Sequence, residues 1–285
     1  FFNKFTNFAK FTNMFYGGFD GNNILDRDMR LMNDRASSSD VGGKAGGSNI
    51  YNLNSSYSPG IGPNNNTVFA YRTAAKILTD NMASRINILA IPGIRDSFVT
   101  DHTQELVREY GQAIYLIDIP SYDKSNVRRY DDSANRVSVN RTIEKFEGRQ
   151  LDNNFTAAYF PDVAIEDDEN NNRVVNVPAS VVALGALGFN DSVAYPWFAP
   201  AGFNRGSLEN VRNTDIRLTA GDRDNLYEAR INPIANFPNG GFVIFGQKTL
   251  QQDKTALDRV NVRRMLLEVK RLIVDVANKL VFEQN

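Results

Sequence analysis

The fold class is decided by the stretch INILAIPG at residues 86–93. Its first six residues are apolar apart from one asparagine, and Pro92-Gly93 then ends the run, which is typical of a short buried strand followed by a turn. A second apolar run, residues 113–119, follows after a segment with helical spacing. Buried strands joined through helices favour a largely parallel sheet that is covered on both faces.

Helix and strand patterns alternate on both sides of this stretch. Upstream, Thr67 is expected to cap a helix over residues 68–84. Downstream, Thr100 or Asp101 is expected to cap a helix that stops at Gly111. Further elements are expected as a short helix at residues 141–146, a strand at 156–160 and an apolar helix at 179–187. The alternation predicts an α/β fold, mixed α+β when the whole chain is considered.

The last third of the chain carries a different pattern. Strand candidates at residues 231–236 and 242–248 are separated by Phe237-Pro238-Asn239-Gly240-Gly241, which is typical of a hairpin turn. A long amphipathic helix is then expected at residues 261–280. Its apolar residues share one side, which we expect to be buried against another surface.

Residues 1–66 lack such a regular pattern. Gly, Asn, Ser and Asp crowd the segment from residue 17 onward, and residues 37–48 predict a surface loop. Before it, four aromatic residues spaced by three or four positions predict one buried helix face: Phe5, Phe8, Phe11 and Phe15. The chain begins without methionine in the middle of this pattern, so we expect it to be a trimmed fragment.

Composition argues against several classes of function. The 285 residues carry 32 basic and 33 acidic side chains and a formal charge of −1, so the broad attraction for nucleic acid or anionic membrane is missing. Cysteine is absent, which excludes disulfides, thiolate metal sites and cysteine nucleophiles. The longest apolar runs are too short to span a bilayer. We expect neither nucleic acid nor membrane as a partner, and assembly in a reducing cytoplasm.

No set of catalytic residues stands out. His102 is the one histidine in the sequence, and its place at a helix start favours a solvated residue over a triad member. No serine sits in a Gly-x-Ser-x-Gly turn, and residues 42–48 lack the order of a phosphate-binding loop. The acidic run at residues 166–169 is better explained as a solvated hairpin tip than as a calcium site. We therefore expect no catalytic residue, no cofactor and no metal.

The most informative signal is a series of short motifs in residues 177–285. In chain order they are Val177-Pro178-Ala179-Ser180, Ala199-Pro200-Ala201-Gly202, Ile231-Asn232-Pro233-Ile234, GFVIFGQKTL at 241–250, Val260-Asn261-Val262-Arg263-Arg264 and LVFEQN at 280–285. Each has an ordinary local meaning, such as a tight turn or an edge strand that contains proline. Together, and in this order, they resemble the tail sheath proteins of contractile bacteriophages.

This resemblance implies a domain organisation. Residues 67–200 are expected to form a subtilisin-like α/β sheet domain without an active site, and residues 201–285 a C-terminal α+β domain made of the hairpin and the long helix. Residues 1–66 are expected to be a loop-rich N-terminal segment or insertion. The family usually continues into a C-terminal arm, which we expect to be missing here.

The resemblance also implies a function. A sheath protein is a structural protein of the virion and not an enzyme. Its copies are expected to stack as hexameric rings around the tail tube, above the baseplate, and to contract. Contraction drives the tube through the host envelope and leads to genome ejection.

Interface residues take the place of catalytic residues in such a protein. The basic side chains of the last helix are the candidate interface with the tube or a neighbouring subunit: Arg263, Arg264, Lys270 and Arg271. A solvated helix face explains the same residues without a partner.

Two other functions are left open by the sequence. One is an α/β hydrolase or protease, which needs His102 close to a serine and a carboxylate. The other is a carbohydrate-binding surface built on aromatic residues such as Tyr51, Tyr57 and Trp197. The setting of Trp197 favours core packing over an exposed platform.

Overall fold

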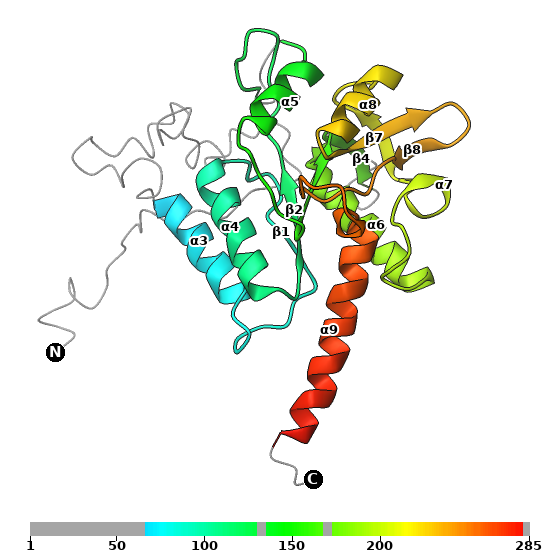
Figure 1. Ribbon diagram of the computed structural model, residues 1–285. Coiled ribbons are helices and arrows are strands. Elements are labelled where there is room, and N and C mark those ends of the chain that lie inside the picture. The colour runs from blue at the N-terminus through cyan, green and yellow to red at the C-terminus, as the bar shows by residue number, and fades with distance from the viewer. Residues whose placement is uncertain (1–65, 130–134, 168–172, 282–285) are drawn as a thin grey trace, which may run out of the picture.

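A five-stranded sheet forms the centre of the molecule, in the order β1-β2-β3-β7-β8 (Figure 1). The computed structural model describes residues 66–129, 135–167 and 173–281. The strands are β1 Ile88–Ala90, β2 Ile114–Asp118, β3 Thr156–Phe160, β7 Ile231–Phe237 and β8 Gly241–Ile244. The first four are parallel, and β8 pairs antiparallel with β7. The predicted parallel sheet and the predicted C-terminal hairpin are confirmed.

Strand β2 is buried along its whole length and shows how the layers are built. Tyr115 and Ile117 belong to one apolar cluster, whereas Ile114 and Leu116 belong to the other. Successive side chains of a strand lie on opposite faces, so a strand that is apolar throughout must be covered on both. The sheet is accordingly the middle of three layers.

Helices α4, α5 and α8 cover the first face of the sheet. They span Ser97–Tyr110, Val139–Glu147 and Ala220–Glu228. Val107, Phe146 and Leu226 are their buried contacts in this layer. The short helix predicted at residues 141–146 is thus confirmed as α5.

The second face is covered by helix α6, the start of helix α9 and a small sheet. The helices span Ala179–Val193 and Val260–Leu280. The small sheet is antiparallel, in the order β5-β4-β6, with strands Arg173–Val177, Val163–Asp167 and Val211–Thr214. Ala183, Leu187 and Val260 contact it or the central sheet within one apolar cluster. Two short elements, α7 Gly202–Arg205 and η2 Ala256–Asp258, complete the chain.

The start of helix α4 differs from the prediction. Asp96 is the N-cap, and its carboxylate accepts the Phe98 N–H at 2.9 Å. Thr100 and Asp101, the caps suggested by the sequence, lie inside the helix. The Thr100 hydroxyl donates to the Asp96 carbonyl at 3.0 Å, a bond that a residue within the helix makes. Gly111 ends the helix as predicted, with φ at 61°.

Helix α3, Asn66–Leu78, packs against α4 and is shorter than predicted. It begins before Thr67, so Thr67 is not its cap. It ends at Leu78 because the following residues turn: the Asp80 carboxylate accepts the Met82 N–H at 2.9 Å. The prediction that the helix continues to residue 84 is therefore wrong.

The central sheet crosses the domain boundary that the sequence suggested at residues 200 and 201. Strand β3 lies before this boundary and β7 lies after it, yet the two strands pair in parallel, with Ala158 opposite Ile231. The boundary therefore describes the order of elements along the chain and not two separate sheets. The Phe5–Phe15 helix and the loop at residues 37–48 lie outside the described residues.

A buried carboxylate ties three parts of the fold together. Asp118, at the end of β2, accepts the backbone N–H of Gly93 at 3.0 Å and that of Ser180 at 2.9 Å. The Ser180 hydroxyl donates to the same carboxylate at 2.7 Å. Beside it, Asp162 accepts from Ala179 and from Arg95. The two carboxylates thus hold the first turn of α6 against the ends of β2 and β3.

Asp118→Asn tests this network through pH. Burial raises the pKa of Asp118, so its contribution to stability is present at acid pH and is lost as the pH rises through the folded-state pKa. At pH 4 the variant is expected to be about 1–3 kcal/mol less stable, because its amide group cannot accept from all three donors. The deficit is expected to shrink as the pH rises from about 4, which urea unfolding at several pH values measures. A deficit that grows with pH contradicts this assignment.

Candidate functional site

Helix α9 projects from the body of the molecule at its C-terminal end (Figure 1). Its first turns are anchored in the core, where Val260 and Leu267 join the apolar cluster on the second face of the sheet. The helix has 21 residues and is therefore about 31 Å long. The half beyond Leu267 lies outside the core. One of its sides contacts the body of the molecule and the other side does not.

Two arginines anchor the first half of α9. The Arg263 guanidinium lies 4.3 Å from the centre of the Phe155 ring, and burial lowers the pKa of Arg263. Arg264 forms an ion pair with Asp191 of α6 at 2.5 Å. The Arg264 side chain is only 6% exposed, so this pair is part of the packing between the two helices.

Polar contacts hold the second half of α9 to the body. Lys270 donates to the Gly111 carbonyl at 2.9 Å, and Arg271 donates to Asn87 at 2.7 Å. Asp275 forms an ion pair with Arg85 at 2.5 Å. The side of α9 that faces the sheet is thus polar over its last three turns.

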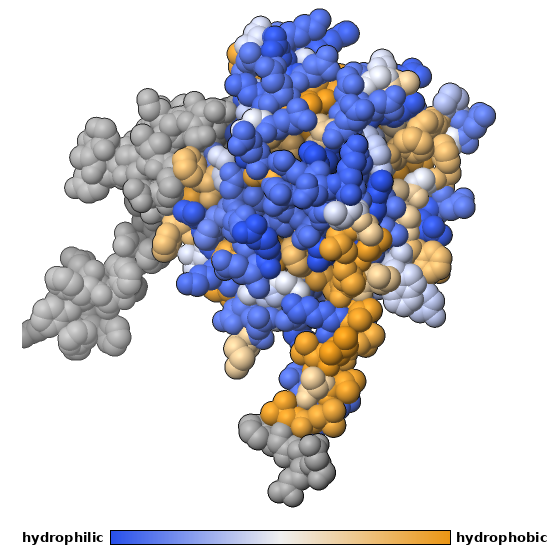
Figure 2. Space-filling view, in the orientation of Figure 1, coloured by the Kyte–Doolittle hydropathy of each residue, from blue (hydrophilic) through white to orange (hydrophobic). Residues whose placement is uncertain are grey.

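The opposite side of α9 is apolar and exposed, as the orange surface of the projecting helix in Figure 2 shows. We call these residues the outer stripe: Met265, Leu266, Val269, Leu272, Ile273, Val276 and Leu280. Ile273 is 62% exposed and Leu280 is 63% exposed. Within the described chain this side is exposed, so the surface against which it is buried stays a prediction.

The spacing within the outer stripe is that of a helix-packing seam. Leu266, Val269, Ile273, Val276 and Leu280 follow one another at intervals of three, four, three and four residues. This heptad spacing keeps one row of side chains facing a partner along the helix. A contiguous apolar surface of this kind marks an interaction site.

The described residues do not assemble a catalytic triad. His102 lies on α4, where burial and the Arg72 charge lower its pKa, and within the described part of the chain it forms no hydrogen bond to a serine or carboxylate. The Ser180 hydroxyl donates to Asp118 and not to an imidazole. The same carboxylate also accepts the backbone N–H groups of Gly93 and Ser180, and the serine has no histidine partner of the kind found in a triad among the described residues.

Metal-binding and membrane-spanning features are also lacking where the chain is described. No group of three or more metal-ligating side chains occurs in those ranges. Glu166, in the acidic run, pairs with Arg212, while residues 168 and 169 lie outside the described ranges. None of the helices described is both long and apolar enough to cross a membrane.

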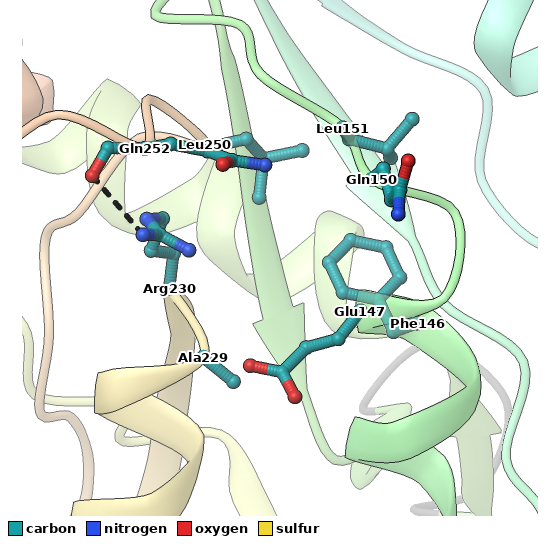
Figure 3. A pocket seen from close by; sticks show the side chains of 8 residues that line it. All are labelled: Phe146, Glu147, Gln150, Leu151, Ala229, Arg230, Leu250 and Gln252. Carbon is teal, nitrogen blue, oxygen red and sulfur yellow. Dashed lines mark hydrogen bonds between the residues drawn. The ribbon is translucent and has the colours of Figure 1, made fainter.

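A cavity of about 220 Å³ lies between the ends of α5 and α8. Figure 3 shows the side chains that line it. Arg230 donates across it to the Gln252 carbonyl at 3.1 Å, and Phe146 and Leu250 supply its apolar wall. Glu147 contributes the carboxylate. Among its lining residues in the described chain, no histidine, serine or lysine is present.

Trp197 lies at the surface rather than in the core. It stacks on Tyr195 with ring centres 4.6 Å apart, and it is 40% exposed. The prediction of core packing is therefore wrong. Tyr51 and Tyr57, the other aromatic residues considered for a carbohydrate surface, lie outside the described residues.

Three curated relatives carry the same name. The chain is 41% identical over 118 residues to the tail sheath protein of Vibrio phage KVP40, which corresponds to 41% of this chain and 18% of the relative. It is 34% identical over 145 residues to the tail sheath protein of Enterobacteria phage T4, with 48% and 22% of the two chains covered. A third match, 30% identical over 118 residues, is the tail sheath protein of Salmonella phage ViI, with 41% and 19% covered.

Over this part of its length the chain is similar to phage tail sheath proteins. The matched region spans about a fifth of the length of these curated relatives. No family model matches the chain.

Solved sheath-related structures share the fold. The PVC sheath complex of an extracellular contractile injection system, in its contracted state, superposes with a TM-score of 0.54 at 20% identity, covering 77% of this chain and 58% of the other. A chain of the anti-feeding prophage baseplate in its contracted state gives 0.54 at 22% identity, covering 70% and 51%. The mixed α+β architecture is thus that of sheath-type proteins.

The four basic residues of the predicted interface contact other parts of the same chain, with Lys270 still exposed, and the interface itself stays a prediction. Arg263 and Arg264 are buried, and Lys270 and Arg271 bind Gly111 and Asn87 of the same chain. The four side chains therefore attach α9 to the sheath fold. A direct role of Lys270 or Arg271 toward a neighbour stays a prediction.

The sequence shows that α9 is amphipathic, but it does not show which of its two sides contacts the rest of the chain. Amphipathic helices in single chains usually bury their apolar side. By this rule, the polar side of α9 was predicted to be the side that contacts another molecule. The deciding information was the set of partners for the polar side, namely Asp191, Gly111, Asn87 and Arg85. These lie far from α9 in the sequence, so spacing alone cannot reveal them.

Arg264→Glu is expected to destabilise the folded chain by about 2–4 kcal/mol, because it puts a carboxylate into a buried position next to the partly exposed carboxylate of Asp191. Urea unfolding followed by circular dichroism measures the loss. Lys279→Glu, on an exposed part of the same helix, is the control and is expected to change stability by no more than about 0.5 kcal/mol. Equal stability of the two variants contradicts the anchoring role.

Proposed function

We propose that this chain is a structural component of a contractile phage tail sheath. Copies of it assemble as stacked hexameric rings around the tail tube, above the baseplate. Contraction of the rings drives the tube through the host envelope and leads to genome ejection. The protein is located in the tail of the virion after assembly in the host cytoplasm, and it acts without nucleic acid, membrane or cofactor as a partner.

The outer stripe of α9 carries this proposal. Seven apolar side chains at helix-packing intervals face away from the body, and the tail sheath relatives supply the class of assembly in which such a surface is used. Covering each side chain contributes roughly 1.5–3 kcal/mol, so even part of the stripe stabilises a contact substantially. In a sheath that contact belongs to a neighbouring subunit.

Contraction needs no chemical fuel in this mechanism. Each subunit moves from one packing arrangement to a second one of lower free energy, and the differences add over all copies. The likeness to structures of contracted assemblies supports such a role for the shared fold. The energy is then stored in contacts between subunits and not in a reaction centre.

The absence of enzymatic activity is part of the same proposal. The sheet domain is proposed to be a subtilisin-like arrangement that has no working active site. Ser180 and Asp118 are bonded to one another inside the fold, and the pair has a structural use in holding α6. The names of the relatives support a structural role as well.

Association through the outer stripe is tested with Ile273→Asp combined with Val276→Asp. Both side chains are more than half exposed, so the fold and the melting temperature are expected to stay unchanged. Self-association of the chain, measured by sedimentation velocity, is expected to weaken at least 100-fold, since two such side chains contribute roughly 3 kcal/mol or more. Negatively stained wild-type protein at high concentration is expected to show tubes or rings.

The matched control is Ala277→Asp combined with Asn278→Asp, which adds the same two charges at exposed positions outside the stripe. It is expected to associate like wild type. A wild-type chain that remains a monomer at every concentration contradicts the proposal. So does hydrolase activity that disappears in His102→Ala.

A further inference from the structure

A second cavity, of about 180 Å³, lies at the carboxyl ends of strands β1 and β2. It has room for roughly six water molecules, since each occupies roughly 30 Å³ in the liquid. Ligands of parallel sheets commonly bind outside the carboxyl ends of the strands. This cavity is separate from α9 and from the outer stripe.

Four cationic side chains from three segments line this cavity. Arg95 follows β1, Arg128 follows β2, and Lys145 and Arg149 belong to α5 and its end. Asp96 is the one carboxylate of the lining within the described chain, and its oxygen is engaged as the cap of α4. The lining thus brings four cations together, and Asp96, Asp162 and Asp101 offset part of their charge.

Two of the four cations are already oriented by neighbours outside the cavity. Arg95 forms an ion pair with Asp162 at 2.6 Å. Arg149 donates to the Thr100 hydroxyl at 2.6 Å and pairs with Asp101, whereas its Nε–H is buried and has no acceptor among the described residues. Held in this way, the two guanidinium groups lose little side-chain entropy when they bind a further group.

Lys145 differs from Arg95 and Arg149 because its ammonium group can still form an ion pair. Its ammonium lies 5.9 Å from the centre of the Tyr122 ring, and it forms no ion pair within the described ranges. Arginine and lysine together bind the oxygens of phosphate or carboxylate groups through charge-assisted hydrogen bonds.

We propose that this cavity is a binding site for an oxyanion, which is either a free phosphate or the carboxylates of an acidic peptide segment. Lys145 and Arg149 contribute the donors, and Arg95 supports the positive potential of the site. The site is independent of the sheath role argued above.

Isothermal titration calorimetry at low ionic strength tests the site with two probes, inorganic phosphate and a hexa-aspartate peptide. Lys145→Glu is expected to weaken binding at least about tenfold, the loss that one charge-assisted hydrogen bond corresponds to. Lys124→Glu is the matched control, since Lys124 is exposed and does not line the cavity. Circular dichroism melting curves verify that both variants fold like wild type.

Tighter binding of phosphate assigns the site to a small anion, and tighter binding of the peptide assigns it to protein carboxylates. Equal weakening in Lys145→Glu and Lys124→Glu overturns the proposal, because the attraction is then a property of net charge. Absence of binding for both probes overturns it as well. Lys145→Gln, which removes the charge without reversing it, is expected to show an intermediate loss.

Discussion

The double burial of strands β2 and β3 is the constraint on which the rest of the structure depends. All ten of their residues are buried, and their side chains enter apolar clusters on both faces of the sheet. Such strands cannot exist without helices on either side, so the chain must cross from face to face between strands. Buried polar groups at the strand ends then need partners, and Asp118 and Asp162 satisfy this by binding the first turn of α6.

The same constraint explains the position of α9. The second face of the sheet is covered by α6, the small sheet and the first two turns of α9, which leaves no apolar surface for the remainder of that helix. The sheet-facing side of the remainder is therefore polar and binds the loops at the start of β1 and β2. Its apolar side is left exposed in the described chain.

Sequence reasoning predicted the elements that local pattern controls. The strand at 156–160, the stop at Gly111 and the hairpin after residue 231 match the structure because apolar runs, a left-handed glycine and a turn sequence act over a few residues. The cap of α4 was missed because Asp96 and Thr100 both fit the rule and both are buried, and only the bond from the Phe98 N–H to the Asp96 carboxylate separates them. The joining of β7 to β3 across more than 70 residues has no local signal.

For the candidate site, the sequence predicted which types of residue α9 carries, but it did not predict in which direction their side chains point. Arg263 and Arg264 have the composition of a basic surface, yet Phe155 and Asp191 turn them inward. The structural neighbours include contracted assemblies, in which the fold itself is recognisable despite identities near one fifth. Packing of the three layers is thus more tightly specified than any single charged position.

The attachment of the projecting half of α9 has a mechanical consequence. Lys270, Arg271 and Asp275 reach loops and an exposed arginine rather than a complementary apolar groove. Hydrogen bonds and ion pairs at a wet surface exchange readily with water, whereas interlocked apolar side chains do not. A sideways force on the C-terminal end of α9 is therefore expected to break and re-form these polar contacts before it disturbs the three-layer body. The helix can then bend about its buried first turns, which stay fixed.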